Sequence, residues 1–160
     1  MKILMAYASG TGTTEKCARL LAEKLPGADL CDLKKNLVDP SSYDAVIVGG
    51  SIRFGALASR ARTYLEKCEP ILAGKRLGLF ICCASADNID DIFARNIPEK
   101  LLEHAAVHIS FGGELAVERA RGVEKLMLKM MLKSSGKDSP APQVFPERIA
   151  EFAEKIMAEA

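Results

Sequence analysis

Short, continuously apolar segments alternate with longer segments of helical periodicity along this chain of 160 residues. The apolar segments are KILMAYA (2–8), ADLCDL (28–33), YDAVIVGG (43–50), RLGLFICCA (76–84) and AVHISFGG (106–113). Strands that are apolar on both sides are typical of a parallel sheet with helices on both faces. The pattern therefore predicts an α/β fold with a sheet of five parallel strands.

Helices are predicted between these strands and after the last one. Apolar residues recur at helical spacing over 14–25, 57–68 and 89–104, and a last helix is expected from Pro146 to about Ala158. Because crossovers between parallel strands are right-handed, few arrangements of five strands are possible, and the order 2-1-3-4-5 is the natural one. No repeat or linker divides the chain, so we expect one domain over 1–160.

The segment 114–143 is too long for an ordinary connection between a strand and a helix, so we interpret it as an insertion. Its centre, 122–134, has an apolar face made of Val123, Leu126, Met127, Met130 and Met131. A basic stripe is made of Lys125, Lys129 and Lys133. This pattern suits a helix on an anionic membrane surface, an adaptable surface for a protein partner, or a helix packed on the core with its lysines in water.

Charge and cysteine content narrow the class of protein. The formal net charge is +1, which argues against a general nucleic-acid binder. The five cysteines have no C-x-x-C pair and no metal-ligand spacing, so we predict no metal site and expect reduced thiols in a cytosolic protein. Cys82 and Cys83 lie in a predicted strand and are expected to be buried. No apolar run has transmembrane length, and we therefore expect a soluble, cytoplasmic protein.

The first predicted strand is followed by the segment SGTGTT (9–14). Its glycines are Gly10 and Gly12, and its hydroxyl residues are Ser9, Thr11, Thr13 and Thr14. In sheets of this kind, ligands bind at the carboxyl ends of the strands, and the N-terminus of the following helix attracts anions. The nucleotide P-loop pattern is absent, and Glu15 replaces the third glycine of the dinucleotide pattern. We therefore predict a site for one phosphate group held by neutral donors, with a simple capped helix start as the alternative.

The SGTGTT segment resembles the [ST]-x-T-G-x-T phosphate loop of flavodoxins. GGSIRFG (49–55) and CASADN (83–88) follow two further predicted strands, where flavodoxins place the loops that flank the flavin ring. The resemblance implies a flavodoxin-like fold with flavin mononucleotide (FMN) as the cofactor. The cofactor contacts that it implies are Ser9, Gly10, Thr11, Gly12, Thr13, Thr14, Ser51, Ile52, Arg53, Phe54, Gly55, Ala84, Ser85 and Ala86.

A narrower resemblance involves two segments. GGSIRFG resembles the G-[AG]-S-I-R-[YF]-G signature of the menaquinone-dependent protoporphyrinogen IX dehydrogenase family, and VEKLMLKMMLKSSGKD (123–138) is similar to that family's segment rich in Met and Lys. The family oxidises protoporphyrinogen IX on FMN during heme biosynthesis and passes the electrons to a membrane quinone. The chain departs from the family at 84–106, which is shorter and carries DNIDD in place of a basic cluster, and at 114–121, which lacks tyrosines.

If the chain follows that family, the flavin carries the chemistry and no catalytic side chain is needed. Arg53 is then the candidate substrate contact, because a guanidinium binds a carboxylate with two parallel hydrogen bonds. It would otherwise stabilise the reduced flavin or lie in solvent as a surface charge. Phe54 either stacks on the flavin ring or anchors its loop in the core.

Two other functions remain open from the sequence. The chain would serve as an electron carrier of the flavodoxin type, with no substrate of its own, although the carriers of that family are strongly acidic and this chain is not. It would alternatively serve as an FMN-binding adaptor on the inner face of the membrane, held there through 122–134. In the first interpretation we expect a small-molecule or quinone redox partner.

Overall fold

The computed structural model describes residues 1–84, 87–114, 121–134 and 142–158. Its strands are β1 (Ile3–Ala8), β2 (Asp29–Asp32), β3 (Ala45–Arg53), β4 (Ala56–Leu57), β5 (Arg76–Cys82) and β6 (Val107–Ser110). Its helices are α1 (Thr13–Lys24), α2 (Ser59–Leu72), α3 (Ile89–Asn96), α4 (Glu99–His104), α5 (Gly122–Ser134) and α6 (Pro146–Met157), with a 3-10 turn at Pro40–Ser42.

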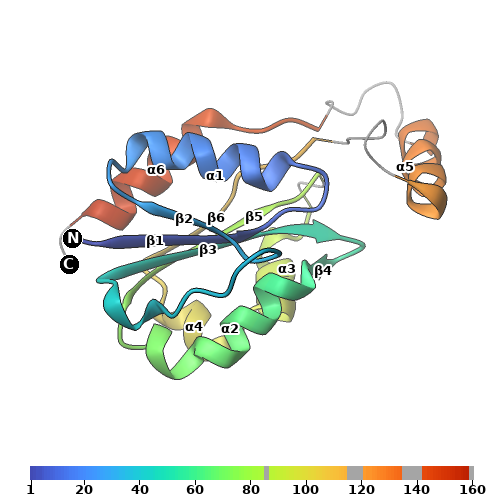
Figure 1. The fold of residues 1–160 in the computed structure, drawn as a ribbon. Helices are drawn as coiled ribbons and strands as arrows, with labels where there is room; N and C mark the ends of the chain where they lie inside the picture. Colours follow the sequence, from blue (N-terminus) through green and yellow to red (C-terminus); the bar gives the residue numbers. More distant parts are fainter. Residues whose placement is uncertain (85–86, 115–120, 135–141, 159–160) are drawn as a thin grey trace.

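Five parallel strands form the body of the sheet, in the order β2-β1-β3-β5-β6 (Figure 1). Strands β5 and β6 are the fourth and fifth apolar segments of the sequence, so the predicted order is confirmed. The structure adds β4, which pairs antiparallel with the end of β3 through Ile52–Leu57 and Arg53–Ala56. A strand of two residues has no periodicity that a sequence pattern can reveal, and it was therefore not predicted.

Helices cover the sheet on both faces, with α1 and α6 on one side and α2, α3 and α4 on the other (Figure 1). Strand β1 shows why its sequence is apolar throughout. Ile3, Met5 and Tyr7 pack into the core beneath α1 and α6. The residues between them, Leu4, Ala6 and Ala8, pack into the core on the opposite face.

Three aromatic rings form the centre of the core beneath α1 and α6. The ring of Phe80 stacks on that of Phe111 with centroids 4.7 Å apart, and Phe152 meets both rings edge-on. Gly49 lies next to Phe80 on the neighbouring strand, and a Cβ atom at this glycine would overlap the Phe80 ring. Because Gly49 has no side chain, the Phe80 ring can occupy the space next to it.

The predicted helix over 89–104 is wrong as a single element, because the structure has α3 and α4 there. Pro98 causes the break: the residue before a proline is excluded from helical geometry, and Ile97 is extended with ψ 134°. The last residue of α3, Asn96, is buried and reaches the β3–β4 hairpin. Its side chain accepts a hydrogen bond from the Leu57 N–H (2.9 Å) and donates one to the Gly55 carbonyl (2.9 Å).

Candidate functional site

The loop between β1 and α1 folds back at the carboxyl end of the sheet. Gly12 has φ 102°, a conformation that favours glycine, and the residue immediately precedes the first turn of α1. The hydroxyl of Ser9 accepts a hydrogen bond from the Gly12 N–H at 3.0 Å and holds the loop closed. The N-terminus of α1 thereby opens onto the end of the sheet, where the helix dipole favours an anion.

A cavity of about 80 Å³ lies at this end of the sheet. The predicted site residues that line it are Gly10, Thr11, Thr13, Thr14, Ser51, Ile52, Arg53 and Ala84. Ser9, Gly12, Phe54 and Gly55 belong to the same loops but do not line the cavity, and Ser85 and Ala86 lie outside the described residues. The structure therefore brings segments from three predicted loops to one cavity.

Five lining residues were not predicted, namely Cys82, Gly113, Glu114, Glu124 and Leu128. The last two come from α5, one turn apart, and place one side of this helix at the cavity. The sequence pattern of this helix predicts only its apolar face and its lysine stripe. The alternation of apolar and charged residues in 122–128 contains Glu124 and Leu128, but nothing in the sequence identifies what they contact.

The hydroxyls of Thr13 and Thr14 are the clearest sign of a ligand. Both residues are buried, and both Oγ1 atoms lack a hydrogen-bond partner among the described residues. A buried hydroxyl left without a partner costs about 1–3 kcal/mol, and native structures rarely leave two side by side. Together with the N–H groups at the start of α1, these hydroxyls fit the oxygens of a phosphate group.

The cationic side chain of Arg53, a predicted site residue, lies beside this loop, which itself contains no Lys or Arg. Arg53 extends from β3 over Gly10, where a Cβ atom would lie 2.6 Å from the guanidinium carbon of Arg53. Gly10 thus leaves the room that the arginine occupies. Nη1 of Arg53 forms an ion pair with Oε1 of Glu124 at 2.8 Å, which joins the end of β3 to α5.

Phe54 lies at the tip of the β3–β4 hairpin and is 64% exposed, so it does not anchor its loop in the core, and stacking on a flavin ring stays the prediction for this residue. Phe54 and Gly55 both have positive φ, at 50° and 76°. Two successive residues of this kind form the type I′ turn that joins two-residue hairpins. The turn directs the aromatic ring into solvent, where it is available to a flat ligand or to a partner.

Cys82 borders the cavity from the end of β5. A hydrogen bond with Cys17, together with burial, raises the pKa of the Cys82 thiol well above its ordinary value. The hydroxyl of Thr14 lies near this thiol and favours its ionisation, but it does not reach hydrogen-bond geometry. Cys82 therefore stays a neutral thiol at neutral pH, which makes it a poor nucleophile and means that it adds no negative charge to the cavity lining. Cys82 and Cys83 are both buried, as expected.

Comparison with solved structures finds the same fold in flavin proteins. Oxidised flavodoxin 2 from Bacillus cereus is 23% identical, with a TM-score of 0.60 and coverage of 98% of this chain and 97% of the flavodoxin. A flavoprotein in complex with FMN from Lactobacillus acidophilus is 16% identical, with a TM-score of 0.53 and coverage of 68% and 91%.

A third likeness involves a larger protein. Rubredoxin oxygen:oxidoreductase from Desulfovibrio gigas is 18% identical, with a TM-score of 0.56 over 98% of this chain, and the chain spans 37% of the length of that oxidoreductase. No curated protein matches the chain. The family model described as flavodoxin domain matches residues 4–141. Because this match covers most of the sequence, and the topology and phosphate-type loop agree with it, the chain belongs to the flavodoxin domain family.

Proposed function

We propose that this protein binds FMN and transfers electrons through it. The observation that carries the proposal is the pair of buried, unpartnered hydroxyls of Thr13 and Thr14 at the start of α1. Membership of the flavodoxin domain family and the FMN complex of the Lactobacillus acidophilus flavoprotein support it. When bound, FMN supplies the transfer of electrons between a donor and an acceptor.

The residues of the chain hold and orient this cofactor. The loop 9–14 would bind its phosphate through Thr13, Thr14 and the N–H groups at the start of α1. The loops 51–55 and 84–86 would flank its ring, the second of them lying in part outside the described residues. Arg53 lies at the cavity as the candidate contact for an anionic substrate or for the cofactor itself.

More specifically, we propose a dehydrogenase of the protoporphyrinogen type that passes electrons to a quinone. The GGSIRFG segment supports this assignment through its resemblance to that family, and the structure adds that Arg53 of this segment lines the cavity. Protoporphyrinogen IX carries carboxylate groups that suit a guanidinium. The net charge of +1 also distinguishes the chain from strongly acidic electron carriers.

Anaerobic reduction of the FMN-loaded protein by protoporphyrinogen IX tests this assignment. We expect the flavin absorbance to bleach on addition of the donor and to recover on addition of a menaquinone analogue, while free FMN at the same concentration serves as the control. Firm FMN binding without bleaching beyond the control would refute the dehydrogenase and favour the electron carrier. Protein that does not bind added FMN at all would refute the flavin proposal itself.

We also propose that α5 rests on an anionic membrane surface. Four of its apolar side chains are exposed to solvent: Val123 (73%), Leu126 (60%), Met127 (41%) and Met130 (61%). The helix projects from the carboxyl end of the sheet (Figure 1) and carries Lys125, Lys129 and Lys133. Apolar side chains beside lysines suit the boundary between acyl chains and anionic headgroups. No helix among the described residues is long and apolar enough to cross a bilayer.

Replacement of two exposed methionines tests this contact. The double variant Met127→Ser/Met130→Ser should lower binding to vesicles that contain phosphatidylglycerol by about tenfold, because two apolar side chains no longer enter the lipid. Sedimentation with vesicles measures the bound fraction. Met157→Ser is the matched control, since Met157 is 51% exposed on α6. Equal binding by the double variant, or no binding by the parent protein, would contradict the proposal.

A further inference from the structure

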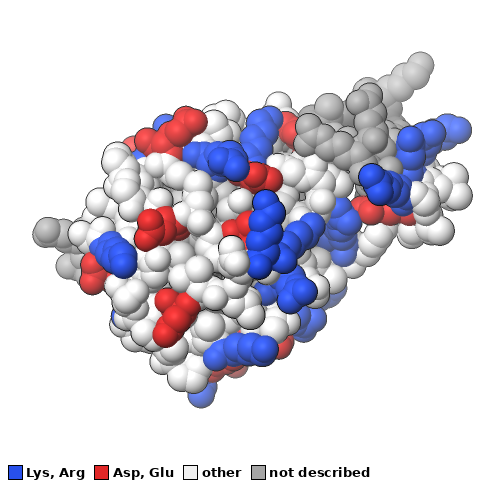
Figure 2. Space-filling view, in the orientation of Figure 1, with Lys and Arg blue, Asp and Glu red and all other residues white. Residues whose placement is uncertain are grey.

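A second cavity, of about 300 Å³, adjoins the first and has a different chemical character. It lies between the loop after β2, the loop after β1 and the start of α2. Its cations are Lys34 and Arg53, and its hydroxyls come from Ser9, Ser51 and Ser59. Its lining contains no acidic residue. On this face of the molecule, Lys and Arg side chains gather at the same end of the sheet (Figure 2).

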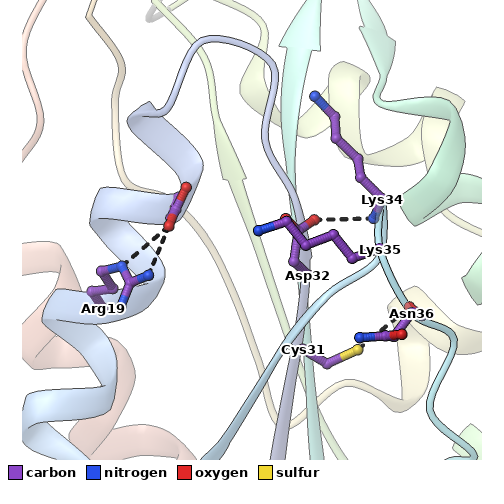
Figure 3. Close-up of polar contacts among 7 residues, drawn as sticks. Arg19, Cys31, Asp32, Lys34, Lys35 and Asn36 are labelled. Carbon is purple, nitrogen blue, oxygen red and sulfur yellow. Dashed lines mark hydrogen bonds and ion pairs between the residues drawn. The ribbon is translucent and has the colours of Figure 1, made fainter.

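Lys34 lies in the turn after β2. Asp32 accepts a hydrogen bond from the Lys34 N–H at 3.0 Å, and its other oxygen lies 3.8 Å from Nζ of Lys35. The carboxylate is therefore paired with Lys35, and the side chain of Lys34 extends away from it toward the end of the sheet that carries the β1–α1 loop (Figure 3). Among the described residues, no ion pair neutralises Lys34.

Arg53 stands in the wall between the two cavities and lines both. Its guanidinium has five N–H donors in a rigid plane, and the ion pair with Glu124 engages Nη1. The remaining donors stay available to a second anion. The guanidinium occupies the room that Gly10 leaves. In this position it already binds the carboxylate of Glu124, which lies in another element, α5.

We infer that the second cavity is an anion subsite, in which Lys34 and Arg53 bind a carboxylate or phosphate group of the small-molecule redox partner. Arg53 shares its charge with Glu124, whereas Lys34 has no ion pair among the described residues, so the cations around this cavity keep a positive charge that an anion compensates. Helix α2 begins at the same cavity without a side-chain cap, and the N–H groups of its first turn add to this preference. The inference rests on the proposed function only for the nature of the partner, because the anion site itself depends on no cofactor.

Titration of the ¹⁵N-labelled, FMN-loaded protein with inorganic phosphate and with malonate tests the subsite. Ser9, Gly10, Ser51 and Arg53 are also expected FMN contacts, so the reporters are the Ala58 and Ser59 amides, which line only the second cavity and whose saturable shifts measure it. At constant ionic strength, Lys34→Gln should weaken anion binding by about tenfold, the loss expected for one charged contact. Lys35→Gln removes the same charge from the neighbouring residue, which does not line the cavity, and should leave the affinity unchanged.

The two anions distinguish the chemistry of the partner, since tighter binding of malonate indicates a carboxylate and tighter binding of phosphate indicates a phosphate. An absence of saturable shifts at Ala58 and Ser59, or an equal loss in both lysine variants, would overturn the subsite. If the protein does not take up FMN, the proposed function fails separately. Titration of the ligand-free protein then still decides the subsite, because Thr13 and Thr14 report the first cavity and Ala58 and Ser59 the second.

Discussion

Replacing Thr13 and Thr14 together by valine is expected to weaken FMN binding by at least about a hundredfold. Each hydroxyl lost removes one hydrogen bond to a charged phosphate, which contributes about 1.5–3 kcal/mol. Both hydroxyls are buried and have no partner among the described residues, so no competing interaction within the protein offsets the loss. Quenching of flavin fluorescence measures the affinity.

The same variant is expected to unfold at the same temperature as the parent protein or at a higher one, when both are free of FMN. Valine has the shape of threonine without its hydroxyl, and the change removes two buried polar atoms that the ligand-free protein leaves unsatisfied. Affinity for the ligand and stability of the free protein should thus change in opposite directions.

The control is Thr63→Val on α2, where the side chain is exposed and lies outside the first cavity. This variant should bind FMN as the parent does. An unchanged FMN affinity in the double valine variant would show that the phosphate binds elsewhere. A fall of more than a few degrees in its unfolding temperature without ligand would show that the two hydroxyls stabilise the fold itself.

Phe80→Ala is expected to lower the free energy of unfolding by about 4 kcal/mol, because the ring is fully buried between Phe111 and Phe152. For a protein of this size the unfolding temperature should fall by about 10 °C. Gly49→Ala should also destabilise the protein, by about 1–3 kcal/mol, because the added methyl group overlaps the Phe80 ring.

The double variant Gly49→Ala/Phe80→Ala should lose less stability than the sum of the two single variants. Once the ring is absent, the methyl group at Gly49 occupies space that would otherwise be empty. Urea denaturation of the four proteins measures this coupling. Gly74→Ala is the control: its nearest neighbour would be the Ile71 carbonyl oxygen at 3.6 Å, an ordinary contact, and its stability should change little. Strictly additive losses would show that Gly49 and Phe80 do not restrict each other.

The sequence predicted the features that depend on neighbouring residues and on periodicity. Apolar strands, their order and the phosphate-type loop at 9–14 all follow from such patterns, and the helix at 122–134 coincides with α5. The break between α3 and α4 could also have been predicted, because Pro98 disfavours helical geometry at the residue before it. The helical spacing of the apolar residues on both sides of Pro98 pointed instead to one helix.

The contacts between side chains that complete the site could not be predicted from sequence patterns. The ion pair between Arg53 and Glu124 joins residues far apart in the chain, and neither residue carries a local signal for the other. The same holds for Lys34, which lies at the second cavity although no local pattern around it indicates this position. Such contacts depend on the direction of individual side chains in the folded protein, which periodicity does not specify.

The hydrogen bonds of Asn96 couple the β3–β4 hairpin to α3. Its amide group holds the hairpin at the turn through Gly55 and at β4 through Leu57, and it also donates to the Ile92 carbonyl within its own helix. The hairpin therefore cannot separate from α3 without exposing a buried amide group, and both should exchange their amide hydrogens as one cooperative unit. One wall of the cavity should thus be as rigid as the helix behind it, and we expect adjustments to different ligands in the other walls, among them α5.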